Sequence, residues 1–431
     1  MLGAGVAASR WLVRPAVPDD TDAFGFALGM GETYDLSLFQ PQFPGYPVFV
    51  FAGKVLCWCG LSGLAAATLL AALSSGAAAV ALGLIAWKLA GDFRAAVAAA
   101  ALHAVAFLPW LLGSSALSDG PGLALAAGAL AALLWERALL AGLLGGLLLG
   151  TRLSYLPLLL PLLARRRAVQ GLLAATLAWL CPFVAFFGPR TLFGEGLTHL
   201  RGHFTGFGGS IATRPSLVQR GEALFRGLFY DGLAPSLWAL GALAVLLVLT
   251  ARRKPAAKPF LAALAPYGVW AFLGQNLIEQ PRHLLPLVEG LLVLLALLLE
   301  PRWVAAAALI LAAASAPLLL ERLRTPPAAA QAAAWIAAHG QPAHALVAAR
   351  RSARFFRAAG LQTQEHFALS DVIGTLARMD SLPQPIWLTS ELSAAPADHW
   401  TLSPGPAFCR DARLGRAQPC LSLVQLSWSP R

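Results

Sequence analysis

Apolar runs separated by short polar loops make up most of this chain of 431 residues. The runs cover residues 62–87, 95–113, 121–135, 138–151, 153–164, 168–188, 233–251, 259–274, 283–299 and 303–320. A helix needs about 20 apolar residues to cross the hydrocarbon core of a bilayer, which is roughly 30 Å thick. Only 12% of the residues are charged, whereas about 25% are charged in an ordinary soluble domain. The sequence therefore predicts an all-α polytopic membrane bundle of about ten or eleven transmembrane helices.

The basic residues between the runs predict the topology. With the N-terminus inside, alternate loops place the short basic clusters on the cytoplasmic face, as the positive-inside rule requires. These clusters are Lys88/Arg94, Glu136/Arg137, Arg165-Arg166-Arg167, Arg252-Arg253-Lys254 and Arg302. A single crossing by residues 138–164 would place Arg165-Arg166-Arg167 on the outer face. These residues must therefore cross the membrane as two short passes, with a break at Thr151-Arg152-Leu153. The outer loops 18–60 and 189–232, and the chain after about residue 321, then face outward.

Residues 1–17 are short for a span and carry Arg10 and Arg14. We expect them to be part of a first helix, and an interfacial helix or a signal-like stub are the alternatives. The net charge of +11 does not indicate a nucleic-acid partner, because the arginines lie in short loops and no basic groove with interleaved aromatic residues is visible.

The composition changes after residue 320. Residues 321–431 mix charged, polar and short apolar stretches and have the size of a small domain. We expect a compact α/β domain there, next to a membrane domain of residues 1–320, and the parity places it outside the cytoplasm. Cys409 and Cys420 are predicted to pair in an oxidising compartment, with two free thiols as the alternative.

Three carboxylates stand together in the first outward loop, at Asp19, Asp20 and Asp22. Charged groups at the boundary of lipid, water and protein are costly and often serve chemistry or ion handling. The alternative is that they solvate the loop and keep it out of the membrane.

Five motifs within residues 15–300, in this order and topology, resemble the GT-C fold glycosyltransferases. Within this fold, the chain resembles the bacterial enzymes related to protein mannosyltransferases and to the lipid A aminoarabinose transferase. The motifs are Asp19-Asp20-Thr21-Asp22, Phe43-Pro44-Gly45-Tyr46-Pro47, Leu117-Ser118-Asp119-Gly120, the broken-helix run from Ala141 to Arg152 (AGLLGGLLLGTR) and Pro281-Arg282-His283-Leu284-Leu285-Pro286.

The resemblance implies a sugar donor on a polyprenyl phosphate and an acceptor hydroxyl on a lipid, glycan or protein. Such a transfer needs a base for the hydroxyl and cations for the leaving phosphate. In relatives, acidic residues of the first outer loop supply the base. The family's acidic pair can be aligned with this triplet in two ways, so the resemblance points first to Asp19 or Asp20 and next to Asp22. Closely spaced carboxylates would also raise one another's proton affinity.

Cations for the phosphate are expected at three positions. Arg282 matches the family's phosphate-contacting arginine. The aromatic residue that follows this arginine in the family is replaced here by His283, and whether His283 contacts the donor or the acceptor is left open. Arg152 at the break and Lys54 on the helix after the PGYP segment are the other candidates. The alternative for each is contact with lipid headgroups.

The remaining polar positions have several readings. Ser118 and Asp119 either cap the helix that follows or contact the donor or an ion. The loop 199–210, which includes His203, mixes histidine, aromatic residues and glycine as acceptor or sugar loops do. Its two histidines are four residues apart but have no third ligand, so no metal site is expected, and a role for a divalent cation in the transfer is left open. His103 is expected to satisfy a backbone carbonyl or a facing side chain.

The sequence thus favours a glycosyltransferase of the bacterial plasma (inner) membrane. A transporter or flippase for a lipid-linked or anionic substrate is the main alternative, because broken helices and intramembrane charges also serve transport. The charged candidates converge on one face and no internal repeat is evident, which disfavours transport. A membrane scaffold with a working outer domain is the second alternative.

Overall fold

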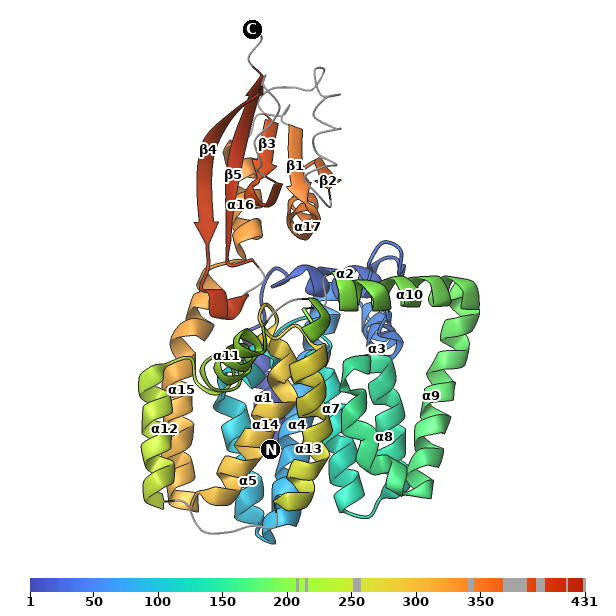
Figure 1. The fold of residues 1–431 in the computed structure, drawn as a ribbon, viewed down its shortest axis with the longest axis vertical. Coiled ribbons are helices and arrows are strands. Elements are labelled where there is room, and N and C mark those ends of the chain that lie inside the picture. The colour runs from blue at the N-terminus through green and yellow to red at the C-terminus, as the bar shows by residue number, and fades with distance from the viewer. Residues whose placement is uncertain are drawn as a thin grey trace. The chain divides into compact units, whose positions relative to one another are not determined.

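The computed structural model describes residues 1–206, 209–213, 216–250, 257–339, 345–366, 386–392, 400–415 and 418–428 (Figure 1). The predicted basic cluster Arg252-Arg253-Lys254 and part of the loop 199–210 lie outside them. The chain forms two compact units, the first made of Met1–Pro15 with Gly25–Leu320 and the second of Ala16–Phe24 with Glu321–Arg431. The second unit therefore includes a short N-terminal segment that the sequence assigns to the membrane domain.

The first unit is a bundle of helices. Its α-helices are α1 (Leu2–Leu12), α3 (Pro47–Trp58), α4 (Gly63–Ala90), α5 (Phe93–Val105), α6 (Phe107–Gly113), α7 (Asp119–Leu134), α8 (Ala138–Thr151), α9 (Arg166–Phe187), α10 (Pro189–Thr205), α11 (Leu217–Leu228), α12 (Leu237–Thr250), α13 (Lys258–Gly274) and α14 (Leu285–Leu298). Shorter helical segments are η1 (Leu153–Ala164), η2 (Ile211–Thr213), η3 (Phe229–Leu233) and η4 (Pro281–Leu284). The helices α2 (Thr21–Gly31) and α15 (Pro301–Arg324) begin in one unit and end in the other. Neighbours α4, α7, α8 and α9 run side by side, and α10 turns across at the end of α9 (Figure 1).

Several helices are long and apolar enough to cross a membrane. Among the described residues, four stretches meet this test by length and composition, and six do if each of two bent pairs counts as one span. The four are Gly63–Ala90, Arg166–Phe187, Pro281–Leu298 and Arg302–His339. Other predicted runs correspond to the shorter apolar helices α7, α8 and η1. These helices identify the chain as an integral membrane protein.

Prolines explain where the helices break. Pro109 lacks an N–H group, and its ring would collide with the carbonyl group of Val105 in a continuous helix, so α5 and α6 meet at a bend of 70°. In η1, Pro157 and Pro161 likewise remove two backbone donors, and this segment is a 3-10 helix rather than an α-helix. Because α8 ends at Thr151 and η1 begins at Leu153, the predicted break around Arg152 is confirmed.

Glycines on α8 allow the close packing of α8 against α9. A Cβ atom at Gly142 would lie well inside contact distance of the Ala168 carbonyl, and one at Gly146 would lie 2.6 Å from the Cβ atom of Ala175. Small residues that let backbones approach are typical of helix packing in membranes. The glycine-rich run before Arg152 therefore fixes α8, and with it the position of the break.

The second unit contains a five-stranded mixed sheet with the strand order β2-β1-β3-β5-β4. Its strands are β1 (Ala345–Ala349), β2 (Thr363–His366), β3 (Ile386–Thr389), β4 (Trp400–Cys409) and β5 (Cys420–Trp428). The strands β1, β2 and β3 are parallel, and β5 is antiparallel to both β3 and β4. Two helices, α16 (Ala328–His339) and α17 (Arg350–Ala358), and the short turns η5 (Ser390–Leu392) and η6 (Ala412–Leu414) complete it.

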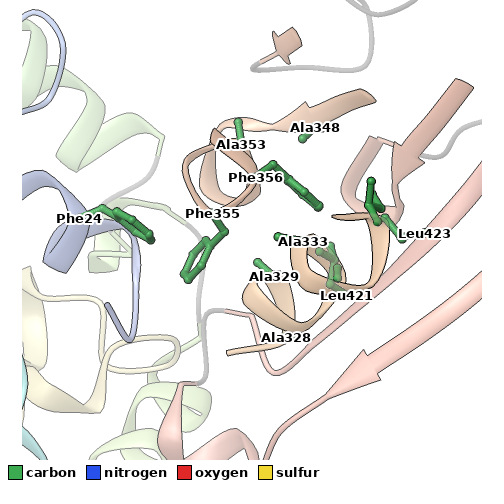
Figure 2. Packing of buried hydrophobic residues seen from close by; sticks show 12 residues of the cluster. Phe24, Ala328, Ala329, Ala333, Ala348, Ala353, Phe355, Phe356, Leu421 and Leu423 are labelled. Carbon is green, nitrogen blue, oxygen red and sulfur yellow. The ribbon is translucent and has the colours of Figure 1, made fainter. Parts of the chain in front are cut away.

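The core of the second unit lies between the sheet and its helices. Figure 2 shows Phe356, Leu421 and Leu423 among buried alanines of α16 and α17. Phe24 joins this core because its ring meets the edge of Phe355 at 4.7 Å between ring centres. This contact explains why the segment Ala16–Phe24 belongs to the second unit.

A disulfide bond joins Cys409 at the end of β4 to Cys420 at the start of β5, with a Cα–Cα distance of 4.1 Å. The predicted pairing is confirmed, and it is consistent with an oxidising compartment.

Candidate active site

A buried acidic residue begins α7 in the first unit. Asp119 is the first residue of this helix, and both Asp119 and the preceding Ser118 are fully buried. The Ser118 side chain makes no capping hydrogen bond to the helix. Its Oγ atom instead accepts a hydrogen bond of 3.0 Å from Nη1 of Arg152. The Ser118 side chain therefore does not cap α7 but bonds to Arg152.

Arg152 lies at the break between α8 and η1 and connects this break to α7. Its Nη2 atom is 2.7 Å from Oδ1 of Asp119, and the two side chains are 6% and 0% exposed. Arg152 can approach α7 this closely because Gly122 has no side chain. A Cβ atom at Gly122 would lie only 2.9 Å from the Cβ atom of Arg152. A buried ion pair in a membrane helix bundle is costly to form and marks a functional position by default.

The segment η4, which directly precedes α14, contributes the next residues. Nη2 of Arg152 is 3.3 Å from Nδ1 of His283. Because a guanidinium group only donates hydrogen bonds, Nδ1 must accept, and the His283 proton then resides on Nε2. The neighbouring Arg282 is 9% exposed and interacts electrostatically with Arg152. The predicted residues Asp119, Arg152, Arg282 and His283 thus meet in one place.

Two buried tyrosines support this cluster and were missed in the sequence. The Tyr267 hydroxyl on α13 donates a hydrogen bond of 2.6 Å to the carbonyl oxygen of His283. The ring of Tyr155 meets the Tyr267 ring edge-on at 5.4 Å and lies 5.3 Å below the guanidinium carbon of Arg152. The sequence did contain a signal for these two residues. The chain has only five tyrosines, and a tyrosine in an apolar helix usually needs a polar partner for its hydroxyl group.

The FPGYP motif also reaches the cluster. Tyr46 sits at the start of α3 with a positive φ angle of 51° and interacts electrostatically with Arg152. This backbone conformation is uncommon outside glycine and often occurs at functional sites.

His203 lies on α10 rather than in a loop, because the helix continues to Thr205. Its Nε2 atom is 2.6 Å from the carbonyl oxygen of Gly274, and its ring stacks on Trp270 at 6.3 Å. It interacts electrostatically with His283, which places it beside the cluster.

Lys54 contacts the end of α2. Its Nζ atom donates to the carbonyl oxygens of Met30, at 3.5 Å, and Glu32, at 3.2 Å. A cation at this position interacts favourably with the carbonyl end of a helix.

The three carboxylates Asp19, Asp20 and Asp22 belong to the second unit. Asp19 contacts Nη2 of Arg322 at 2.5 Å and Nη1 of Arg410 at 3.3 Å. Burial alone would raise the pKa of Asp19, but the charges and hydrogen bonds of Arg322 and Arg410 outweigh it and hold the pKa below its usual value. Asp20 accepts a hydrogen bond of 2.9 Å from the backbone N–H of Ala23, and Asp22 lies in the first turn of α2.

Within the described part of the chain, no group of three or more His, Cys, Asp or Glu side chains has an arrangement that could hold a metal ion.

Comparison with known proteins shows the fold. No protein-family model matches the chain, and no curated protein matches its sequence. The crystal structure of ArnT from Cupriavidus metallidurans bound to undecaprenyl phosphate aligns with 100% of this chain and 99% of its own, with a TM-score of 0.53 and 15% identity. The cryo-EM structure of the arabinofuranosyltransferase AftD from Mycobacteria aligns with 100% of this chain and 40% of its own, with a TM-score of 0.41 and 16% identity. The ArnT alignment confirms the predicted fold: this protein is a GT-C-like membrane bundle with a small C-terminal α/β domain.

Proposed function

We propose that this protein is a glycosyltransferase that moves a sugar, a hexose or a pentose, from a polyprenyl-phosphate donor to an acceptor hydroxyl. The observation that carries the proposal is the buried cluster in which Arg152 contacts Asp119 and His283 and interacts with Arg282. Guanidinium groups bind phosphate oxygens by paired, charge-assisted hydrogen bonds, which are strong where water is excluded. A lipid phosphate is a ligand that suits such a site at the boundary of a membrane.

The structural relative supports the same ligand class. ArnT was crystallised with undecaprenyl phosphate, and it shares its fold with this chain along nearly its whole length. The fold alone fixes neither the sugar nor the acceptor, which we leave as a lipid, glycan or protein hydroxyl.

The cluster suggests how the transfer proceeds. The bond between the sugar C1 atom and the phosphate oxygen breaks, and the acceptor oxygen bonds to C1 while its proton passes to a base. Negative charge then grows on the departing polyprenyl phosphate, and Arg152 and Arg282 stabilise it. Asp119 holds the Arg152 guanidinium in position, and His283 presents its Nε2–H group as a further donor.

We assign the base to the acidic segment of the first outer loop, as the resemblance implies. Both oxygens of Asp19 already contact arginines, and its lowered pKa makes it a poor proton acceptor. We therefore place Asp20 and Asp22 ahead of Asp19 as candidates for the base, whereas the sequence alone places Asp19 with Asp20.

Two further residues are proposed to contact the substrates. His203 neighbours His283, and its ring stacks with Trp270, so the two residues could border the sugar or the acceptor. Lys54 is the third candidate cation for the donor phosphate.

The reaction would take place at the outer face of a bacterial plasma membrane, with the second unit outside the cytoplasm. The disulfide bond between Cys409 and Cys420 supports an oxidising location for that unit.

Binding of undecaprenyl phosphate by the purified protein tests the proposal without knowledge of the sugar. We expect Arg282→Ala and Arg152→Ala to weaken binding at least about tenfold, the loss of roughly one charge-assisted hydrogen bond. Arg282→Lys should recover part of the affinity, because an ammonium keeps the charge but not the paired geometry. Arg302, exposed and paired with Glu300, provides the control, and Arg302→Ala should bind like the wild type. Equal binding by all variants would contradict the proposed site.

A further inference from the structure

A second buried polar cluster lies in the first unit, outside the contacts of the candidate active site. Nδ1 of His103 on α5 is 2.7 Å from Oε1 of Glu289 on α14, and both side chains are 1% exposed. Nε2 of the same ring is 3.1 Å from both the Oγ atom and the carbonyl oxygen of Ser75 on α4. The prediction that His103 satisfies a carbonyl or a facing side chain is confirmed, and the cluster connects three helices.

The histidine end of this cluster is itself fixed. Arg10 of α1 is fully buried and donates to the carbonyl oxygens of His103, at 3.4 Å, and Ala104, at 2.8 Å. These carbonyls lie just before the bend between α5 and α6, where helical hydrogen bonds are interrupted. The Arg10 guanidinium also lies 4.3 Å above the Trp110 ring of α6, so it holds both sides of the bend.

Glu289 belongs to α14, the helix that directly follows the active-site residues of η4. The segment η4, with Arg282 and His283, continues directly into α14. Glu289 follows Arg282 by seven residues, about two helical turns and roughly 10 Å along the axis. A shift or rotation of α14 at Glu289 is therefore transmitted to Arg282 and His283.

A small cavity lies beside this part of α14. A cavity of about 30 Å³ is lined by Glu289, Pro286 and Gly290 of α14 and otherwise by apolar side chains, including Phe260 and Leu264 of α13. Oε2 of Glu289 has no hydrogen-bond partner among the described residues. The contact through Oε1 is thus the polar anchor of α14 next to unfilled space.

We infer that the Glu289–His103 pair is a lock that sets the position of α14 and thereby places Arg282 and His283 for the donor phosphate, an inference that rests on the proposed function. Glu289 is a positioning residue, because it acts through α14 and contacts neither Arg282 nor His283 in the described structure.

The decisive variant replaces both partners by apolar residues of similar size. Glu289→Met alone leaves His103 buried without its partner and is expected to be unstable. The double variant Glu289→Met/His103→Phe leaves neither member of the pair without its partner, and Arg10 keeps its bonds to the carbonyl oxygens of residues 103 and 104, so its thermal stability should exceed that of Glu289→Met alone. Its affinity for undecaprenyl phosphate should nevertheless stay reduced about tenfold or more, because the lock is absent.

Two single variants complete the test. Glu289→Gln keeps a hydrogen bond to the imidazole and should bind undecaprenyl phosphate within about threefold of the wild type. Val288→Ala removes a fully buried neighbour on the same helix; it should lower the melting temperature through the lost packing but leave the affinity unchanged.

Backbone hydrogen exchange over residues 281–288 provides a readout that needs no ligand. We expect faster exchange in Glu289→Met/His103→Phe than in the wild type and in Val288→Ala. A double variant with wild-type affinity and wild-type exchange would overturn the lock. Failure of the wild type to bind undecaprenyl phosphate would instead contradict the proposed function, and the exchange measurement would still decide whether the pair positions α14.

Discussion

The carboxylate of Asp119 lies 2.7 Å from Nη2 of Arg152, and neither side chain has appreciable contact with solvent. The pair joins the first residue of α7 to the break between α8 and η1, two places that are 33 residues apart in sequence (152 − 119). Because each charge loses its hydration on burial, each depends on the other and on the surrounding donors and acceptors. Arg152 has further contacts with Ser118 and His283, so the pair organises the whole candidate site.

Removal of one partner of this pair should be costly. Arg152→Ala and Asp119→Ala should each lower the free energy of unfolding by about 3–5 kcal/mol, since each leaves a buried charge unpaired. The double variant should lose less than the sum of the two, with a coupling energy of about 1–3 kcal/mol. Unfolding in mixed micelles measures all three values, and strictly additive losses would show that the pair contributes no interaction.

Tyr267 should affect the site through a single hydrogen bond. Tyr267→Phe removes the bond to the His283 carbonyl and should cost about 0.5–1.5 kcal/mol of stability, together with a measurable loss of undecaprenyl phosphate affinity. Trp135→Phe removes another side-chain bond to a carbonyl, that of Leu84, and serves as the control. If both variants bind undecaprenyl phosphate like the wild type, Tyr267 does not position His283.

Asp19 should stabilise the second unit in a pH-dependent way. Its pKa is lowered in the folded protein, so its contribution is fully present above its unfolded pKa, near 3.9, and is lost as the pH falls through the lower folded value. At pH 7, Asp19→Asn should cost about 1.5–3 kcal/mol, a range typical of hydrogen bonds to a charged group. Thermal unfolding at pH 7 and below pH 4 checks this. A gap between the two proteins that persists unchanged in acid would argue against the ion pairs.

The second unit should lie outside the cytoplasm. A reporter that is active only in the cytoplasm, fused after Arg431, should therefore stay silent. An active fusion would mean that one membrane pass has been miscounted, most simply at the break between α8 and η1, and the outward placement of the acidic loop would change with it.

The sequence predicted the parts of this structure that depend on local chemistry. The break at Arg152 was predicted from the alternation of the basic loops, and Pro157 and Pro161 after it supply its local cause. The disulfide bond between Cys409 and Cys420 follows from two cysteines in one small domain.

The parts that it did not predict depend on contacts between distant segments. Asp19 pairs with Arg322 and Arg410, about 300 and 390 residues away, and no local pattern reveals such a pairing. Glu289 and Tyr267 lie in apolar helices where a single polar residue has no visible partner until the helices are packed. Hydrophobic periodicity locates helices but does not tell which faces meet.

Sugar transfer by the purified protein tests the central claim most directly. The protein would be supplied with polyprenyl-phosphate-linked sugars extracted from bacterial membranes, together with the acceptor lipids and glycans of those membranes. Asp20→Asn or Asp22→Asn should reduce turnover about 100-fold to 10,000-fold, the range for loss of a general base. Arg282→Ala should weaken use of the donor at least about tenfold, whereas Asp19→Asn should act mainly through stability. Wild-type turnover in Asp19→Asn, Asp20→Asn, Asp22→Asn and Arg282→Ala alike would contradict the proposed site, and absence of any transfer by the wild type with every lipid-linked sugar would contradict the proposed function.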